Sequence, residues 1–600
     1  MDRRNFLASG TAAGAVAMLP NAAMALQARP GDAALNATFT RIFMEAAQRS
    51  PELATSLGFD KGPGAPLKHR LSDRSLAAKK ANLARTKAGI AAIEAIDPAG
   101  LSKDAKLNRD VVLYSLTSQT VGQEQFGVDS PQRPFTITQQ GGAYFSVPDF
   151  LNSSHTIVTA DDAEAYLDRT AAFATALDQD SEVQAEQAAR GYLAPGFSLD
   201  LALGQMAALR RPEAAANTLT QSIVRRTANK IPGDWGARCA TIVSEKVYPA
   251  LDRQIALVKK LRAGARTSAG LWDVPKGAEL YAAALEQATT TKFTPDEVHT
   301  LGRAQVAEIS AQLDAILKSQ GLTKGTVGDR LTALNAMPAQ LYADTPAGRA
   351  ELIKGLNEGN AAMQAKLARA FNAPPSAPLN IQAVPVDIQD GASNGYYSRA
   401  ALDGSRPAIY WINLKSVADW PKYTLPSLTY HEGVPGHHLQ ITIAQGSSQP
   451  LIRKVGGFSA YSEGWALYAE QVADELGGYA TPLEKAGYLQ SFLFRAARLV
   501  VDTGIHAKRW TREQATDYMV ATTGFARPRS QREVERYCTQ AGQACSYKVG
   551  HIAWLRARDN AKKILGAKFD IKRFHDVLQD GAVPLTILER LVEERARALV

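Results

Sequence analysis

The sequence is poor in cysteine, has no long run of basic residues and contains no internal repeat. Three cysteines among 600 residues are too few for a disulfide framework. The 68 basic residues outnumber the 59 acidic ones, but they are dispersed, which argues against nucleic acid as a partner and leaves a weak preference for acidic partners. With 45% hydrophobic and 21% charged residues, the chain has a globular composition and is long enough for several domains.

The three cysteines are expected to differ in state. Cys538 and Cys545 flank the turn-forming segment 540–543, so an oxidising compartment would allow a disulfide bond between them, and the sequence leaves this open. Cys239 is expected to be a buried thiol. The sequence leaves the oligomeric state open as well.

The N-terminus has the pattern of a twin-arginine export signal. Arg3 and Arg4 precede a stretch rich in alanine and glycine, and residues 23–25 form an A-x-A cleavage site. The apolar stretch is too short for a stable membrane anchor, although a retained anchor remains the alternative. We therefore expect residues 1–25 to be removed and the mature protein to be periplasmic or secreted.

Hydrophobic periodicity predicts a mostly α-helical fold with a small β-sheet. A helical N-terminal region is expected over residues 26–375, and a catalytic region that carries the sheet over 376–600. Thr294, Pro295 and Glu297 form a typical helix start, and a capping box begins at Thr511. The expected helices cover residues 75–96, 103–116, 160–190, 213–228, 237–261, 294–318, 347–371 and 482–508, and the expected strands cover 379–388 and 408–413, with a turn-rich segment at 391–406 between them.

Three of the nine histidines lie within residues 431–438, which read HEGVPGHH. Zinc hydrolases typically carry a His-Glu pair and a second histidine one helical turn later; the histidines bind the metal and the glutamate accepts a proton from water. In the common form the second histidine is at i+4, but here Pro435 occupies that position. On a regular helix His438 would lie about 10.5 Å from His431 along the axis, too far for both to bind one ion.

Pro435 and Gly436 therefore indicate an interruption of the helix, because proline lacks an N–H and glycine tolerates unusual backbone angles. If the interruption absorbs two residues, His437 becomes the second ligand; if it absorbs three, His438 does. We favour His437 and regard His438 as a possible ligand or a residue that contacts one. The alternative interpretation is a proline-glycine turn with histidines in a polar loop.

Glu463 is the candidate third ligand. It follows His437 by 26 residues on a separate predicted helix, and three protein ligands would leave a fourth position for water. Glu470 is seven residues further on and shares its helix face. The alternative is a solvated helix with surface acids. The sequence thus predicts one zinc ion per chain, held by His431, His437 and Glu463.

Other polar residues of the C-terminal region are candidates for contacts around the site. Arg498, Asp502 and His506 are spaced four apart on the predicted helix 482–508 and form one stripe, in which Arg498 and Asp502 could pair. If the stripe faces inward, these residues would contact the substrate or the metal ligands. If it faces outward, it is an ordinary charged surface.

Two tyrosines and three basic residues complete the candidate set. Tyr537 and Tyr547 are candidates for stabilising an oxyanion, with Tyr547 the first choice, although a structural role is the common alternative for each. Arg498, Arg536 and Lys548 are candidates for binding a peptide carboxylate.

The segments 431–438, 461–466, 501–506 and 542–550 together resemble the bacterial family called domain of unknown function 885, over nearly all of the mature chain. That family is similar in turn to the helical zinc peptidases of the carboxypeptidase Taq, thimet oligopeptidase and angiotensin-converting enzyme group. The resemblance implies a deep channel walled by the helical N-terminal region. It also implies that residues 408–413 form the edge strand that binds the substrate backbone, and it favours His437 over His438.

Together these features predict a zinc-dependent hydrolase that cleaves amide bonds of short peptides, as a carboxypeptidase, dipeptidase or oligopeptidase. Glu432 would accept a proton from water and return it to the leaving amine. Two alternatives remain: a zinc amidohydrolase acting on non-peptide amides, and a non-catalytic periplasmic peptide-binding protein. The natural substrate, and exo- or endo-cleavage, are left open by the sequence.

Overall fold

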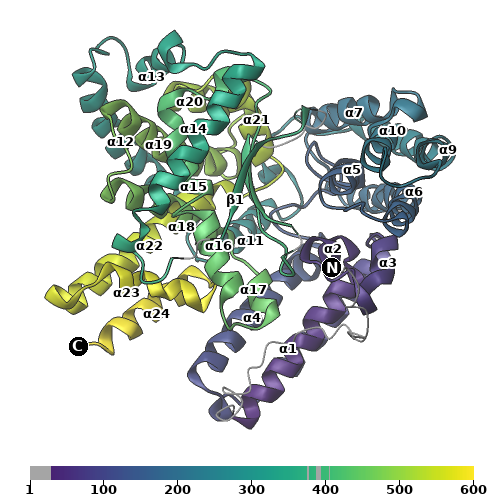
Figure 1. Ribbon diagram of the computed structural model, residues 1–600, viewed down its shortest axis with the longest axis horizontal. Helices are drawn as coiled ribbons and strands as arrows, with labels where there is room; N and C mark the ends of the chain where they lie inside the picture. Colours follow the sequence, from purple (N-terminus) through teal and green to yellow (C-terminus); the bar gives the residue numbers. More distant parts are fainter. Residues whose placement is uncertain (1–28, 375–376, 387–388, 390–393, 405) are drawn as a thin grey trace, which may run out of the picture.

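The computed structural model describes residues 29–374, 377–386, 389, 394–404 and 406–600 (Figure 1). Most of these residues are helical and a small three-stranded sheet lies among them, which confirms the predicted fold class. The predicted export signal lies outside the described residues. Within them, no helix is both long enough and apolar enough to cross a membrane.

The first ten helices form two groups, one in the lower part of Figure 1 (α1–α4) and one at the upper right (α5–α10), and α11 lies near the centre of the view. The second group encloses a hydrophobic core that includes Tyr166, Phe173 and Leu251. The expected helix at 213–228 begins only at Thr218, and a π-helical turn over Val243–Val247 interrupts the one expected at 237–261. The bounds are α1 Pro30–Arg49, α2 Pro51–Leu57, α3 Leu76–Glu94, α4 Lys103–Val121, α5 Ala143–Ser153, α6 Ala160–Ala189, α7 Gly196–Arg210, α8 Thr218–Thr227, α9 Trp235–Ile242, α10 Tyr248–Ala263 and α11 Gly277–Thr289.

Many of the remaining helices pack around a second core that includes Trp465 and Trp554, whereas α13, α20 and α21 contribute to smaller clusters beside it. Both predicted capping boxes are confirmed, at Thr294 and at Thr511. Leu107 of α4 belongs to this core too, so the core draws on both sides of the domain boundary expected near residue 375. The bounds are α12 Pro295–Ser319, α13 Val327–Asn335, α14 Pro346–Gln364, α15 Leu425–Glu432, α16 His437–Gly446, α17 Leu451–Val455, α18 Ser459–Glu475, α19 Pro482–His506, α20 Arg512–Thr523, α21 Arg527–Tyr537, α22 Gln543–Leu565, α23 Ile571–His575 and α24 Leu585–Arg597.

The sheet has the strand order β1-β3-β2, with β1 (Leu379–Ala383) parallel and β2 (Gly395–Ser398) antiparallel to β3 (Ala408–Ile412). The two predicted strands are confirmed, although both are shorter than expected. The segment in which only turns were expected contains β2, whose two tyrosines pair with Tyr410 and Trp411 of β3.

The expectation that residues 408–413 form an edge strand is wrong. β3 is hydrogen-bonded on both sides and is the central strand, with alternate side chains buried at Ala408, Tyr410 and Ile412. Strand β2, which the sequence did not predict, pairs with the side of β3 that an edge strand would leave unpaired. The strand at the edge toward the candidate site is therefore β2.

Helices α18 and α22 approach each other closely through two glycines. A Cβ atom added at Gly464 would lie 2.4 Å from the carbonyl carbon of Gly550, and one added at Gly550 would lie 1.9 Å from the carbonyl oxygen of Ala460. Real Cβ atoms do not come this close to backbone atoms, so neither glycine can be replaced without separating the helices. This contact fixes the distance between Glu463 on α18 and Tyr547 on α22.

We predict that Gly550→Ala destabilises the protein by at least about 1–3 kcal/mol, because the added methyl group overpacks the interface between α18 and α22. The matched control is Gly204→Ala on α7, where the added Cβ would meet no atom within 4 Å. That change should stabilise the protein by about 0.5–1 kcal/mol through its helix propensity. Urea unfolding followed by circular dichroism measures both, and equal midpoints for the two variants would contradict the prediction.

Candidate metal centre

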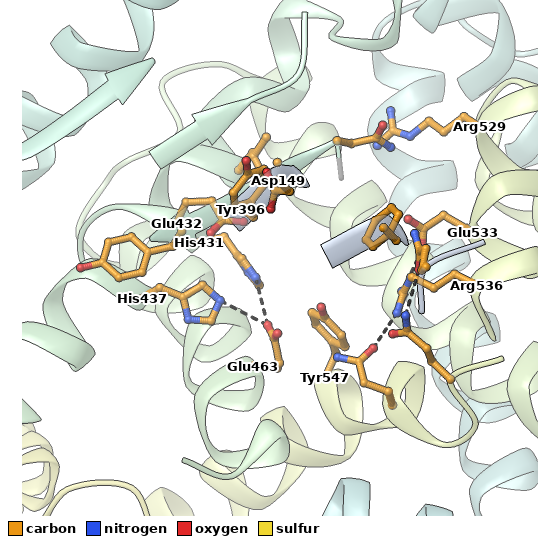
Figure 2. Close-up of a pocket in the computed structure, with 18 of the residues that line it drawn as sticks. Asp149, Tyr396, His431, Glu432, His437, Glu463, Arg529, Glu533, Arg536 and Tyr547 are labelled. Carbon is orange, nitrogen blue, oxygen red and sulfur yellow. Dashed lines mark hydrogen bonds and ion pairs between the residues drawn. The ribbon is translucent and has the colours of Figure 1, made fainter. Parts of the chain in front are cut away.

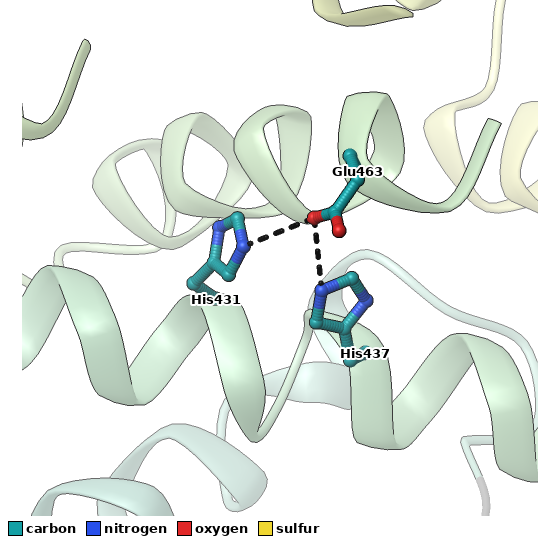
Figure 3. Close-up of side chains that lie close together, drawn as sticks. All are labelled: His431, His437 and Glu463. Carbon is teal, nitrogen blue, oxygen red and sulfur yellow. Dashed lines mark ion pairs between the residues drawn. The ribbon is translucent and has the colours of Figure 1, made fainter. Parts of the chain in front are cut away.

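The predicted interruption lies between α15, which ends at Glu432, and α16, which begins at His437. The four linking residues include Gly436, whose added Cβ would lie 2.0 Å from the carbonyl oxygen of His431 and 2.3 Å from that of Tyr430. Only glycine allows the chain to turn this tightly against the end of α15. The turn brings the rings of His431 and His437 to a centroid separation of 4.9 Å (Figure 3).

Neighbouring helices hold this turn in place. The indole nitrogen of Trp465 on α18 donates a hydrogen bond to the carbonyl oxygen of Pro435, at 2.9 Å. The side-chain oxygen of Asn360 on α14 accepts a hydrogen bond from the backbone N–H of Val434, at 3.1 Å. The turn is therefore bonded to the same helix that carries Glu463.

The carboxylate of Glu463 contacts both histidines. Its Oε2 atom lies 3.5 Å from Nε2 of His431 and 3.2 Å from Nε2 of His437 (Figure 3). The three candidate ligand atoms all lie within 4.8 Å of one another. Oε2 of Glu463 and Nδ1 of His437 are buried, and neither has a hydrogen-bond partner among the described residues.

Glu470 contacts His431 at the ring nitrogen that does not face Glu463. Nδ1 of His431 is 2.9 Å from the carboxylate of Glu470, which is fully buried and also accepts hydrogen bonds from Ser427 and Ser491. This bond places the proton of a neutral His431 on Nδ1 and leaves the Nε2 lone pair directed at the cluster. Such a carboxylate–histidine pair is the usual support of a metal ligand.

Charges within the cluster compensate one another. Burial lowers the pKa of His431, but Glu463 and Glu470 outweigh it and raise that pKa to about 9. Burial raises the pKa of Glu463, but His437 and His431 outweigh it and hold the pKa well below the usual range of a carboxyl group. The carboxylate therefore stays ionised, which is the form that a metal ion requires.

The donor set fits a catalytic zinc ion. Two imidazole nitrogens and one carboxylate oxygen are a known zinc ligand set, and a fourth position would remain open. Oε2 of Glu463 and Nδ1 of His437 keep no hydrogen-bond partner in the described part of the chain. The third residue comes from a separate helix, as the sequence predicted.

Glu432 and His438 are adjacent in sequence to the candidate ligands but are not members of the cluster. Glu432 is buried beside the cavity, and burial raises the pKa of its carboxyl group. His438 lies outside the cluster: its Nδ1 is 3.2 Å from the hydroxyl of Tyr397 on β2, and its Nε2 is 2.8 Å from the carbonyl oxygen of Ala377. Both ring nitrogens of His438 thus have other partners, and His437 is the histidine that joins the cluster.

A cavity of about 1050 Å³ opens beside the cluster. One wall comes from α15, α16, α18, α19, α21 and α22, and the opposite wall from α5–α8 and the segment before them. Strand β2 contributes Gly395, Tyr396 and Tyr397 to the lining, and Asp149 of α5 lies near Tyr396 (Figure 2). The site thus lies between the two cores.

The two candidate tyrosines have different surroundings. Tyr547 lines the cavity, and its ring is nearly parallel to that of His431, with the centroids 6.3 Å apart (Figure 2). Tyr537 does not line this cavity; its hydroxyl accepts a hydrogen bond from Arg498 and donates one to Glu533, each at 2.8 Å. Of the two, only Tyr547 has access to a bound molecule.

The polar stripe of α19 faces inward, but the predicted pair within it does not form. Arg498 lines the cavity and binds Glu533 of α21 at 3.0 Å, so the expected pairing with Asp502 is wrong. Asp502 instead accepts hydrogen bonds from the hydroxyl of Tyr281, at 2.7 Å, and from the backbone N–H of Gly542, at 3.1 Å. Arg498 and Asp502 are therefore each bonded to residues outside α19 and not to one another.

His506 and Lys548 lie away from the cavity. Nδ1 of His506 accepts a hydrogen bond from the backbone of Leu271, and its Nε2 donates to the carbonyl oxygen of Tyr537, both at 3.0 Å. Lys548 is buried 3.3 Å from His551, and burial lowers its pKa to about 7. Lys548 does not line the cavity, so its position does not support the expected contact with a substrate. Arg536, another basic candidate, does line the cavity.

Sequence reasoning missed several arginines of the cavity wall. Arg495 lies three residues before Arg498 on α19, and Arg529 lies seven residues before Arg536 on α21. Residues at these spacings share a helix face, so the predictions for Arg498 and Arg536 could have been extended to Arg495 and Arg529. Arg133 precedes α5 and carries no such signal. The three cysteines are free and buried, so the disulfide bond that the sequence left open is not formed.

Comparison with known proteins shows one family and several similar solved structures. The model of a family described as "Bacterial protein of unknown function (DUF885)" matches residues 51–592. A "putative lipoprotein" from Colwellia psychrerythraea is 34% identical, with a TM-score of 0.90 over 95% of this chain and 99% of that one. A "putative lipoprotein of unknown function" from Shewanella oneidensis is 18% identical, with a TM-score of 0.70 over 92% and 98%, which shows the shared fold. No functionally curated protein matches.

We predict that Asp502 makes the stability of the protein depend on pH. Burial raises the pKa of this carboxyl group to about 7, and the bonds from Tyr281 and Gly542 offset only part of that shift. Because the pKa is about 3.9 in the unfolded chain, the folded state binds the extra proton. The contribution is therefore complete below pH 4 and is lost at up to about 1.4 kcal/mol per unit as the pH rises toward 7.

Asp502→Asn, which cannot ionise, should remove this component. Urea unfolding at pH 4, 5.5 and 7 measures the free energy of unfolding of both proteins. As the pH rises, the wild type should lose stability relative to the variant. A constant difference across the three pH values would contradict the prediction.

Proposed function

The chain belongs to the DUF885 family of bacterial proteins of unknown function, and we propose that it is a zinc-dependent hydrolase that cleaves amide bonds of short peptides. The observation that carries the proposal is the convergence of His431, His437 and Glu463 beside a large cavity. Their donor atoms are the kinds that bind catalytic zinc. When bound there, zinc would polarise a carbonyl group and make water more acidic.

Glu432 is the proposed proton carrier. It follows a ligand directly, lines the cavity and is absent from the cluster of candidate ligands. Burial raises the pKa of its carboxyl group, which makes it a better proton acceptor at neutral pH. Glu432 would take a proton from the attacking water and deliver it to the leaving amine nitrogen.

Tyr547 and the cavity wall supply the remaining functions. The Tyr547 hydroxyl would donate a hydrogen bond to the oxyanion that forms at the attacked carbonyl carbon. Arg498 and Arg536, both on the cavity wall and both bound to Glu533, would hold the carboxylate of a peptide. A volume of about 1050 Å³ accommodates a short peptide and excludes a folded protein.

Export through the twin-arginine route is part of the proposal. The arginine pair and the cleavage site lie in residues 1–25, and two proteins with similar structures are described as lipoproteins. A periplasmic peptide hydrolase would meet peptides that have left the cytoplasm.

We predict that the purified protein binds about one zinc ion per chain and that His437→Ala abolishes this binding, because it removes one of three ligands. His438→Ala is the matched control: it alters the adjacent residue, whose ring nitrogens bond to Tyr397 and Ala377. It should retain zinc with at most about 10–100-fold weaker affinity. Plasma emission spectrometry after dialysis measures the metal, and loss of zinc from His438→Ala alone would make His438 the ligand.

We predict that Glu432→Gln retains zinc and the fold but loses at least about 100-fold in turnover, because glutamine cannot accept the proton. Peptide hydrolysis by the zinc-loaded protein is followed by chromatography, with circular dichroism as the control for folding. Turnover near that of the wild type would remove Glu432 from the mechanism. Zinc and peptide binding without turnover in the wild type would instead support a non-catalytic peptide-binding protein.

A further inference from the structure

The cavity carries a strong excess of positive charge. Outside the cluster formed by His431, Glu432, His437 and Glu463, the charged residues of its lining are six arginines and two carboxylates. The arginines are Arg133, Arg399, Arg495, Arg498, Arg529 and Arg536, and the carboxylates are Asp149 and Glu533. Desolvated positive charges that face one another are unfavourable unless an anion joins them, so the lining is complementary to an anionic ligand.

Two of the arginines are already neutralised in part. Arg498 and Arg536 both bind Glu533, at 3.0 Å each. These two can hold one carboxylate of a substrate, as proposed above, while keeping Glu533 as a shared partner. Of the other lining arginines, Arg495 and Arg529 are carried by the same two helices as this pair, α19 and α21.

Arg495 and Arg529 have no carboxylate partner among the residues that the structure describes. One amino group of Arg495 donates to the hydroxyl of Ser491, at 2.5 Å, and one of Arg529 donates to the carbonyl oxygen of Asp419, at 2.9 Å. The Nε atom of each is buried and lacks a hydrogen-bond partner within the same described part of the chain. Each guanidinium therefore keeps donors for a ligand.

Aromatic rings orient both guanidinium groups. Arg529 lies 3.8 Å from the ring centroid of Phe525, and Arg495 lies 5.9 Å from that of Tyr547. Stacking fixes the plane of a guanidinium, so less entropy is lost when a carboxylate binds it through two hydrogen bonds. The positive charge of Arg495 acts on both Glu432 and Arg529, so Arg495 lies near each of them.

We propose that Arg495 and Arg529 bind an acidic side chain of the substrate, so that the preferred peptides carry aspartate or glutamate close to the bond that is cleaved. The inference rests on the proposed function and names the substrate class of the same site. Arg529 lies on the same side of the cavity as Arg536, with the ligand cluster on the other side (Figure 2). A peptide in this space would have its main-chain carboxylate at Arg498 and Arg536 and its acidic side chain at the second pair.

The test uses the zinc-loaded full chain and pentapeptides of alanine in which a single glutamate or glutamine is moved through each position. Glutamate and glutamine differ only in charge and one polar group, so their ratio isolates the acidic side chain. At one position or more, kcat/KM should be roughly 10–100-fold higher for the glutamate peptide, as expected for a charge-assisted, partly desolvated contact. A ratio near one at every position would overturn the inference.

Arg495→Gln and Arg529→Gln should each lower this ratio at least about tenfold, whereas Arg495→Lys and Arg529→Lys, which keep the charge, should retain part of the preference. The matched control is Arg532→Gln, because Arg532 is on α21 as well but does not line the cavity and pairs with Asp419 at 3.5 Å. For Arg532→Gln, the ratio of kcat/KM between the glutamate and glutamine peptides should equal that of the wild type. Circular dichroism checks folding, and a preference that survives both glutamine variants would overturn the inference.

Binding separates this inference from the proposed function. Calorimetry with zinc-loaded Glu432→Gln and the same peptides should show tighter binding of the glutamate peptide by at least about tenfold. If the wild type cleaves no peptide but this difference is present, the proposed hydrolase activity fails and the inference stands. If peptides are cleaved and bound without regard to glutamate, the activity stands and the inference fails.

Discussion

The tight turn between α15 and α16 is the constraint on which the candidate site depends. Gly436 packs against the carbonyl oxygens of Tyr430 and His431, and this contact brings His437 back to His431 over four linking residues. Trp465 binds the turn to α18, which also carries Glu463. One hydrogen bond thus links the position of two ligands to that of the third, and Glu470 orients His431 from behind.

The sequence was informative wherever neighbouring residues determine the structure. The proline and glycine between His431 and His437 predicted a break, and the helix starts at Thr294 and Thr511 followed from capping chemistry. The spacing to Glu463 suggested a third ligand on another helix, and the structure brings it to both histidines. Each of these features depends on backbone rules that act over a few residues.

The sequence was uninformative where the partner of a residue comes from a distant segment. β2 is only four residues long and lies among turn residues, so its pairing with β3 could not be inferred from periodicity. Arg498 and Asp502 are well spaced for a pair within α19, but Glu533 and Tyr281 compete for them from other helices. Helical spacing shows which face a residue shares but not what packs against that face.

Because both walls of the cavity are needed, the order in which the chain is synthesised limits when the site can exist. The residues of the ligand cluster are complete at Glu463, yet α21 and α22 supply Arg529, Glu533, Arg536 and Tyr547 to the lining. These helices, and α24, which packs on α22, leave the ribosome after the residues of the ligand cluster. A nascent chain therefore contains all three candidate ligands before it can enclose a substrate.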